Sequence, residues 1–266
     1  SGSTAAELDA VEHRLSDVDL DPEWAVTARP GGCPPFSRQF KRHHDHSPLR
    51  WSDVAASNDA NNDYGNATGT SMASPNVAGS LVLLQEYYES LNGVFMKSAT
   101  LKGLACHTAQ DEADMENLNS PAYPGPDPIW GWGLLNTEFA AQTIADAQSN
   151  LALLQENTLN NGEIYTTTVG ISDSQKLMAT ICWTDLAGPT QNTILNSTTP
   201  VLVNDLDLRI YDSSGVEFFP WKLDLNNLPY AVVGDNLVDN VERVEIESPL
   251  AGQYTCLLYT SDAADE

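Results

Sequence analysis

The sequence predicts a helix-rich segment followed by an all-β domain, and two observations predict this order. Three stretches between residues 58 and 150 have the apolar content and the Ser, Asn, Pro or Gly boundaries of α-helices. Beyond about residue 150, apolar and polar residues alternate in several runs that clusters of turn residues separate. Strands at this spacing, with no helices between them, are typical of a β-sandwich or jelly roll. We therefore expect the β domain over residues 151–260 and a tail over 261–266.

Residues 1–57 give no comparable prediction. They contain turn-rich pieces such as Arg29–Pro35 and no sustained period of 3.6 or 2. We assign no fold to this segment. Two interpretations stay open for it: a surface extension that is disordered, or sequence that is foreign to the rest of the chain.

The first predicted helix begins after an Asn-, Asp- and Gly-rich loop over residues 58–69. Pro75 fits only the first turn of a helix, because its missing N–H would have no partner there. Residues 77–84 are apolar on nearly every side, so we expect this helix to be buried rather than amphipathic. Gly93 predicts where it ends.

Two further helices are expected over residues 98–108 and after Asn136, whose side chain suits an N-cap. Four runs of the β domain alternate with a period of two: Lys176–Thr184, Asp205–Tyr211, Val241–Glu247 and Gln253–Tyr259. Residues Asp212–Gly215 have the composition of a hairpin turn.

The charge of the chain excludes several classes of partner. Twelve Lys and Arg residues against 37 Asp and Glu residues leave a formal net charge of -25, which repels phosphate backbones and anionic lipids. No apolar run approaches the roughly 18 residues that a membrane helix needs. We expect neither a nucleic-acid nor a membrane partner. The acidity and two glycosylation sequons, at Asn66 and Asn196, are consistent with secretion.

The strongest chemical signal is the heptapeptide Gly69–Pro75, Gly-Thr-Ser-Met-Ala-Ser-Pro, at the point where a loop becomes a helix. A serine hydroxyl is a weak nucleophile that needs a base and stabilisation of the oxyanion formed by its attack. The free N–H groups of a first helical turn and the positive end of the helix dipole favour that negative charge. The structural alternative for Ser71 is an ordinary N-cap. The complete heptapeptide favours a nucleophile.

This heptapeptide resembles the nucleophile motif of the subtilases, the subtilisin-like serine peptidases, and Ser71 stands where that family has its catalytic serine. Two more segments of the helical part resemble the family, namely Thr108-Ala109 and Gly131–Asn136. Four segments resemble the jelly-roll domain that follows the catalytic domain in some secreted subtilases: Trp183–Asp185, Leu202–Leu208, Asn240–Glu242 and Ala251–Thr255. The resemblance covers about residues 60–258. It implies an α/β fold over residues 58–150, as the C-terminal part of a subtilisin-like peptidase domain.

The sequence departs from the family where the base should be. A subtilase triad has the order Asp, His, Ser, and the residues before Ser71 contain neither glycine-containing motif that carries the first two. The cluster His43–His46 has no counterpart in the family, and we interpret it as a solvated or spurious segment. His107 follows the serine, so we expect it to interact with a helix dipole rather than to act in catalysis.

The family's side-chain oxyanion donor, an upstream Asn, also has no counterpart, because Asn58, Asn61 and Asn62 lie too close to Ser71 in the sequence. We therefore expect the chain to be the C-terminal part of an extracellular endopeptidase that acts on proteins or peptides, with its Asp- and His-bearing half missing. Loss of a triad partner lowers the rate by a factor on the order of 10^4 or more. The chain alone should be almost inactive.

Two alternatives to this function were weighed. One is a non-catalytic β-sandwich binding or interaction module that carries a relic of a peptidase. The other is a different class of serine hydrolase, but the nucleophile elbow of α/β-hydrolases has Gly two residues after the serine, where this chain has Ala73. The first alternative therefore stays open.

Asp205 and Asp207 are candidate metal ligands. They are two residues apart on a predicted strand, so both project to one face while Leu206 and Leu208 project to the other. Carboxylates at this spacing suit a calcium ion together with backbone carbonyls. Resemblance to calcium-stabilised secreted subtilases supports calcium. The alternative is a solvated acidic face, which the acidity of the chain favours.

The four cysteines are too widely spaced for a Cys-x-x-Cys motif. A disulfide between Cys182 and Cys256 requires that their strands are neighbours, and the sequence leaves the pairing open. Four tryptophans are interpreted as core or loop anchors: Trp130, Trp132, Trp183 and Trp221.

Overall fold

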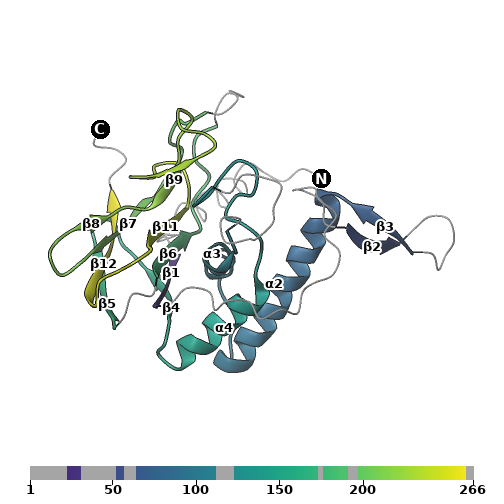
Figure 1. Ribbon diagram of the computed structural model, residues 1–266, viewed down its shortest axis with the longest axis horizontal. Helices are drawn as coiled ribbons and strands as arrows, with labels where there is room; N and C mark the ends of the chain where they lie inside the picture. The colour runs from purple at the N-terminus through teal and green to yellow at the C-terminus, as the bar shows by residue number, and fades with distance from the viewer. Residues whose placement is uncertain are drawn as a thin grey trace, which may run out of the picture.

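The computed structural model describes residues 23–30, 52–56, 64–111, 123–172, 176–190 and 197–261. The described residues form a helical part and a larger β part (Figure 1). The helices are α2 (Thr70–Asn92), α3 (Ser98–Thr108) and α4 (Thr137–Gln148).

The β part contains two four-stranded antiparallel sheets and a small hairpin. The first sheet has the order β11 (Val241–Ile246), β6 (Leu177–Trp183), β1 (Glu23–Pro30), β4 (Leu153–Thr158). The second has the order β5 (Ile164–Ile171), β12 (Gly252–Ser261), β7 (Asp205–Tyr211), β8 (Glu217–Phe218). The hairpin pairs β9 (Trp221–Leu223) with β10 (Ala231–Val233), and a separate hairpin of β2 (Ser52–Ala56) and β3 (Tyr64–Thr68) precedes α2.

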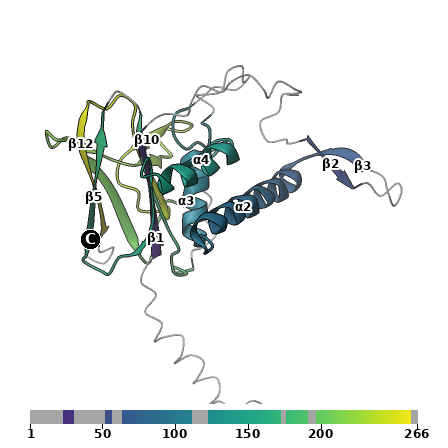
Figure 2. The same cartoon turned by 90° about the horizontal axis from the view of Figure 1, so that it is seen from below.

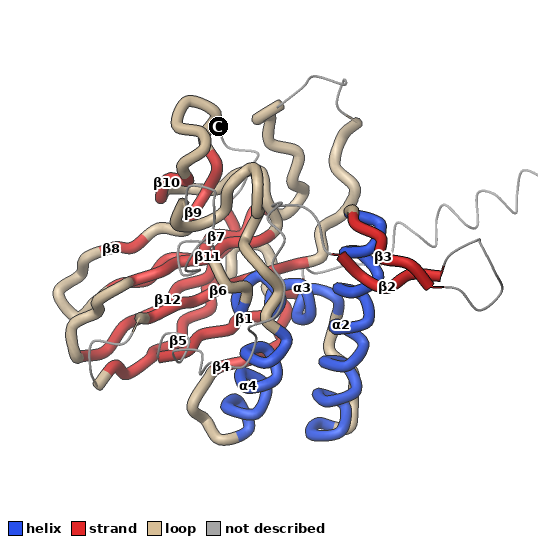
Figure 3. Tube along the Cα trace, turned by 45° about the vertical axis from the view of Figure 1, so that its right-hand side comes forward, coloured by secondary structure: helices blue, strands red, loops and turns tan. Residues whose placement is uncertain are grey.

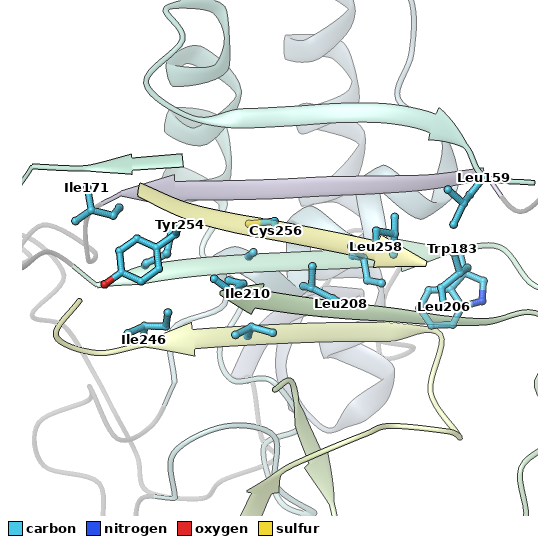
Figure 4. Packing of buried hydrophobic residues seen from close by; sticks show 14 residues of the cluster. Leu159, Ile171, Trp183, Leu206, Leu208, Ile210, Ile246, Tyr254, Cys256 and Leu258 are labelled. Carbon is cyan, nitrogen blue, oxygen red and sulfur yellow. The ribbon is translucent and has the colours of Figure 1, made fainter. Parts of the chain in front are cut away.

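The main hydrophobic core lies between the two four-stranded sheets (Figure 4). The second sheet contributes Leu206, Leu208 and Ile210 from β7 and Leu258 from β12. Leu258 is paired with Leu208 in the register of these two strands. The first sheet contributes other residues of β6 and β11, such as Ile181. Alternate residues of the strands therefore point into the core, as the period of two predicts. Two sheets packed in this way form a sandwich, whereas the jelly-roll topology stays a prediction.

The strand β1 comes from residues 1–57, for which no fold was assigned. It lies between β6 and β4 and pairs antiparallel with both, so that Trp24 is opposite Trp183 on one side and Asn157 on the other. Hydrogen bonding on both edges makes β1 an inner strand of the first sheet. A strand from the N-terminal region thus completes a sheet whose other strands come from the second half of the chain.

The helices cover the outer face of the first sheet. Helix α3 lies directly against β6 and β1, and α4 and α2 lie further out (Figures 2 and 3). A second cluster of buried residues joins the three helices: Leu84 from α2, Leu104 from α3, and Ala140 and Ile144 from α4, together with Met96. The described part of the chain is therefore layered as sheet, sheet, helix α3 and then the pair of α2 and α4. None of its helices combines the length and the apolar character that a membrane span needs.

Several predicted elements are confirmed. Helix α3 has the predicted bounds, and the Asn136 side chain caps α4 by accepting a hydrogen bond from the Phe139 N–H at 2.9 Å. Gly93 ends α2 with φ of 73°, in the left-handed region that favours glycine. Residues Asp212–Gly215 form the predicted turn, in which the Asp212 carboxylate accepts three hydrogen bonds.

The prediction that α2 is buried is wrong for the described residues. Leu84 is its one buried residue, while Val82 and Leu83 are 65% and 62% exposed. Helix α2 packs against α4 and α3 along the side that carries Leu84, and the described residues leave Val82 and Leu83 uncovered. The apolar content of a helix predicts that other segments pack against it. It does not predict whether those segments belong to the described part of the chain.

Candidate active site

Ser71 lies in the first turn of α2, at the N-terminal end of the helix. The hairpin of β2 and β3 leads through Gly69 directly into the helix, and the Gly69 carbonyl accepts hydrogen bonds from the N–H groups of Met72 and Ala73 at 3.0 and 3.2 Å. Gly69 has φ of 155° and a would-be Cβ that meets nothing closer than 4.0 Å. The heptapeptide therefore forms the first turns of α2, and the predicted nucleophile, Ser71, is the second residue of the helix.

The Ser71 side chain is exposed, and no side chain caps the N-terminus of α2. The alternative of an ordinary capping serine is therefore not what the structure shows. The first N–H groups of a helix have no partners inside it, and the helix dipole makes this end positive. The N–H groups of Met72 and Ala73 already donate to the Gly69 carbonyl, so those of Thr70 and Ser71 are the donors left for an anionic oxygen formed next to the Ser71 hydroxyl. The first turn of α2 can thus offer both a nucleophilic oxygen and stabilisation of negative charge.

No described His or Asp side chain forms a hydrogen bond with Ser71. His107 lies on α3, is 1% exposed and places Nδ1 2.9 Å from the Thr180 hydroxyl of β6. It stands in the last turn of α3, as expected, but it is a core residue between helix and sheet. The cluster His43–His46 and the residues Asn58, Asn61 and Asn62 lie outside the described residues. A base for Ser71 is therefore not among the described side chains.

Two of the segments that resemble the subtilases lie side by side. Gln110, just after Thr108-Ala109, pairs with Leu134 through two backbone hydrogen bonds of 2.8 Å. Gly133 has φ of 113°, and a Cβ at this position would come within 2.3 Å of the Gln110 carbonyl oxygen. A side chain cannot fit there, so the second glycine of Gly131-Trp132-Gly133 is required by the close approach of these two segments.

Three of the four tryptophans act as anchors, as predicted. Trp183 is 1% exposed in the sandwich core, and its Nε1 donates to the Asn204 carbonyl at 2.9 Å. The Trp221 ring lies against Gly125, where an added Cβ would be 2.9 Å from it. Trp132 lies under the guanidinium of Arg243. These rings join loops to the sheets, which suits packing better than recognition of a sugar.

Asp205 and Asp207 lie on β7, with Leu206 and Leu208 on the opposite, core-facing side, as predicted. The alternative of a solvated acidic face is wrong, because the two aspartates are only 5% and 2% exposed. Arg209, on the same face, places Nη2 2.8 Å from the Asp207 carboxylate and also contacts Asp235. Pairing with a guanidinium is what allows a carboxylate to be buried here.

These contacts give the calcium prediction no support. The described residues contain no group of three or more His, Cys, Asp or Glu side chains that could hold a metal ion. A guanidinium bonded to Asp207 also opposes a second cation at the same carboxylate. Calcium at Asp205 and Asp207 stays a prediction, and no step of the mechanism below depends on it.

Sequence reasoning missed two buried charged residues of β11. Glu242 is fully buried, and burial raises the pKa of its carboxyl well above the ordinary value, although the Leu208 N–H donates to it at 2.6 Å. Arg243 is 2% exposed and contacts the helical part of the chain. The signal in the sequence is the run Val241–Ile246, in which charged residues occupy both faces of a predicted strand.

The pairing of Cys182 with Cys256, which the sequence left open, is not formed: both thiols are free, as is that of Cys106. The two cysteines belong to different clusters. Cys256 packs in the core between the sheets, whereas Cys182 packs with Ala99 and Val241 beneath α3. Cys182, on β6, points to the outer face of the first sheet, whereas Cys256, on β12 of the second sheet, points into the core, so the first sheet lies between them and their side chains cannot meet.

The model of the subtilase family matches residues 16–133. The match begins well before residue 60, where the resemblance in the sequence began, and it ends at Gly133, the last residue of Gly131-Trp132-Gly133. No curated protein matches the chain. The family match includes the Ser71 heptapeptide and the segments around α3, and it supports a place in the subtilase family for this part of the chain.

Proposed function

We propose that the chain is the Ser71-bearing part of a subtilisin-like serine endopeptidase. The observation that carries the proposal is the exposed, uncapped position of Ser71 in the first turn of α2, within a segment that the subtilase family model matches. The substrate class is a protein or peptide. A His base and the Asp that orients it are supplied by sequence other than the described residues.

In the proposed reaction, the Ser71 oxygen attacks the carbonyl carbon of a peptide bond and its proton passes to the base. The carbonyl oxygen becomes negative and is stabilised by N–H groups at the start of α2. The C–N bond then breaks, and the amine leaves with the proton from the base. Water repeats the sequence on the acyl-serine, releasing the acid and restoring the hydroxyl of Ser71.

Labelling with a fluorophosphonate probe tests this proposal. This chain alone should react slowly, because removal of a triad partner costs a factor on the order of 10^4 or more. A version extended upstream to include the Asp and His motifs should be labelled at Ser71. The variant S71A should lose labelling, whereas S74A should keep it, because Ser74 is exposed in the same helix but is not the proposed nucleophile.

Three outcomes would contradict the proposal. Strong labelling of this chain alone would place the base within it. No labelling of an extended protein that contains both motifs would favour the alternative, a β-sandwich binding module with a relic peptidase segment. Labelling that survives S71A would assign the nucleophile to another residue.

Two further parts of the proposal rest on composition and resemblance. A secreted location is supported by the net charge of -25 and the sequons at Asn66 and Asn196. A loss of mass on endoglycosidase treatment, after expression through a secretory route, would test it. Calcium at Asp205 and Asp207 is supported by resemblance to calcium-stabilised subtilases, and a Tm unchanged by a chelator would remove it.

A further inference from the structure

The outer face of the first sheet is an interface with helix α3. Lys102 donates from Nζ to the Asn240 side chain at 2.6 Å, and the hydroxyls of Ser98 and Thr184 are 3.3 Å apart. The contact of His107 with Thr180 lies in the buried part of the same interface. Polar contacts therefore connect the family-matched segment to the β part along the length of α3. Figure 2 shows α3 lying against the first sheet.

Arg243 of β11 makes the most extensive of these connections. Its Nη1 donates to the backbone carbonyl of Cys106, in the last turn of α3, at 3.0 Å. Its guanidinium carbon lies 4.6 Å from the centroid of the Trp132 ring, a distance suited to cation–π attraction. Its Nε is 2.7 Å from the Glu245 carboxylate, which Lys176 also contacts at 3.1 Å.

The chemistry of these partners explains why an arginine is tolerated at 2% exposure. A buried cation is costly unless it is paired and hydrogen-bonded, and Glu245 supplies the opposite charge. The Cys106 carbonyl belongs to the last turn of α3, where carbonyls have no partner within the helix and the dipole is negative. Arg243 satisfies that carbonyl with a positive donor, and its guanidinium lies over the ring of Trp132.

The same helix positions α2. Leu104 of α3 is fully buried in the cluster that contains Leu84, the one buried residue of α2. Besides its contacts with the hairpin of β2 and β3 and the hydrogen bonds of Gln85 to Met96, the Ser71 helix is held by packing against α3 and α4. Whatever fixes α3 on the sheet also fixes the helix that carries Ser71.

We infer that Arg243 is a positioning residue, through which the β domain fixes the end of α3 and the Trp132 segment and thereby holds the Ser71 helix in place. The β domain is then a structural part of the peptidase module rather than an independent appendage. The positioning of α3 and Trp132 is independent of the proposed peptidase activity. Only the effect on Ser71 rests on that proposal.

Hydrogen exchange of the full chain tests the inference, with R243M and with R209M as the matched control. Arg209 is equally buried, at 4% exposure, and is ion-paired, but it lies on β7, away from α3. R243M should speed exchange by about tenfold or more in residues 101–110 and 130–136. R209M should speed it around β7 and leave those two segments unchanged.

R243K keeps the charge but loses the planar fork, so it should speed exchange in the same two segments by a smaller factor. If R243M does not fold, the exchange rates of R243K in these two segments test the inference instead. Unchanged exchange in both segments in R243K and R243M, or an equal increase there in R209M, would overturn the inference. In an extended, active protein, R243M should slow fluorophosphonate labelling of Ser71. An extended wild-type protein that is never labelled would defeat the proposed function, while the exchange result would still stand.

Discussion

Gly103 of α3 lies against Cys182 of β6, so close that a Cβ added to the glycine would come within 3.0 Å of the Cys182 Cβ. A contact of 3.0 Å is shorter than nine in ten real Cβ contacts, so one neighbour would have to shift by a few tenths of an ångström. The helix can therefore lie close to the sheet because residue 103 has no side chain. The interface that connects the family-matched segment to the β domain depends on this approach.

The substitution G103A should destabilise the chain by about 1–2 kcal/mol. Overpacking costs roughly 1–3 kcal/mol and outweighs the gain of less than about 1 kcal/mol from replacing glycine within a helix. G79A is the matched control on α2, where a Cβ meets nothing within 4 Å, and it should stabilise by about 0.5–1 kcal/mol. Urea unfolding of both variants measures the difference. Equal stabilisation by both would show that α3 has room to move away from the sheet.

The outcome for α2 shows where sequence reasoning reaches its limit. Residues 77–84 predict a helix, and the structure contains one, but their apolar content also predicts burial, which the described residues do not provide. Helix formation depends on local sequence and capping, such as Gly93 at the end of α2. Burial depends on which other segments are present to cover the helix, and no local pattern contains that information.

Leu83 and Leu84 give this distinction a direct test, because they are adjacent on α2 and differ in burial, at 62% and 1% exposure. L84A should lower the free energy of unfolding by about 2–4 kcal/mol, since it leaves a cavity where α2, α3 and α4 meet. L83A should change it by less than about 0.5 kcal/mol. Chemical denaturation measures both. A comparable loss in L83A would mean that another segment covers the outer side of α2.

The strands were predicted more completely than the contacts between them. The runs that became β6, β7, β11 and β12 alternate in polarity, and that period is a local property. Strand β1 was missed, because the short run Glu23–Pro30 stands among turn-rich residues without a repeat. The nucleophile candidate Ser71 was found from a local motif. Arg243 was not, because its partners Cys106 and Trp132 lie more than 100 residues away in the chain.

Glu242 should make the stability of the chain depend on pH. Burial, and secondarily the nearby Asp207, raise the pKa of its carboxyl above the ordinary value of 4.5. The folded chain then holds a proton that the unfolded chain has lost, so this group lowers stability as the pH rises above 4.5 towards its folded pKa. E242Q cannot ionise. It should match the parent near pH 4.5 and exceed it in stability near neutral pH.

The difference in unfolding free energy between E242Q and the parent, measured by urea unfolding from pH 5 to 8, checks this prediction. The surface variant E86Q, on an exposed part of α2, serves as the control and should show no such trend. A difference for E242Q that is constant over the range, or that shrinks as the pH rises, would contradict a raised pKa for Glu242.

The three described thiols should be chemically inert in the folded chain. Burial raises the pKa of Cys182 to about 12 and that of Cys256 to about 11, and it also raises the pKa of Cys106. The thiolate is the reactive form, so at pH 8 Cys182 and Cys256 should react at least about a hundredfold more slowly than free cysteine, and Cys106 should also react more slowly. A C33S variant removes the fourth cysteine, and a thiol-specific disulfide reagent is then followed by mass spectrometry in buffer and in urea. If one of the three thiols reacts in buffer as fast as it does in urea, the structure around it opens readily. For Cys106 and Cys182 this would be the α3 interface, and for Cys256 the core between the sheets.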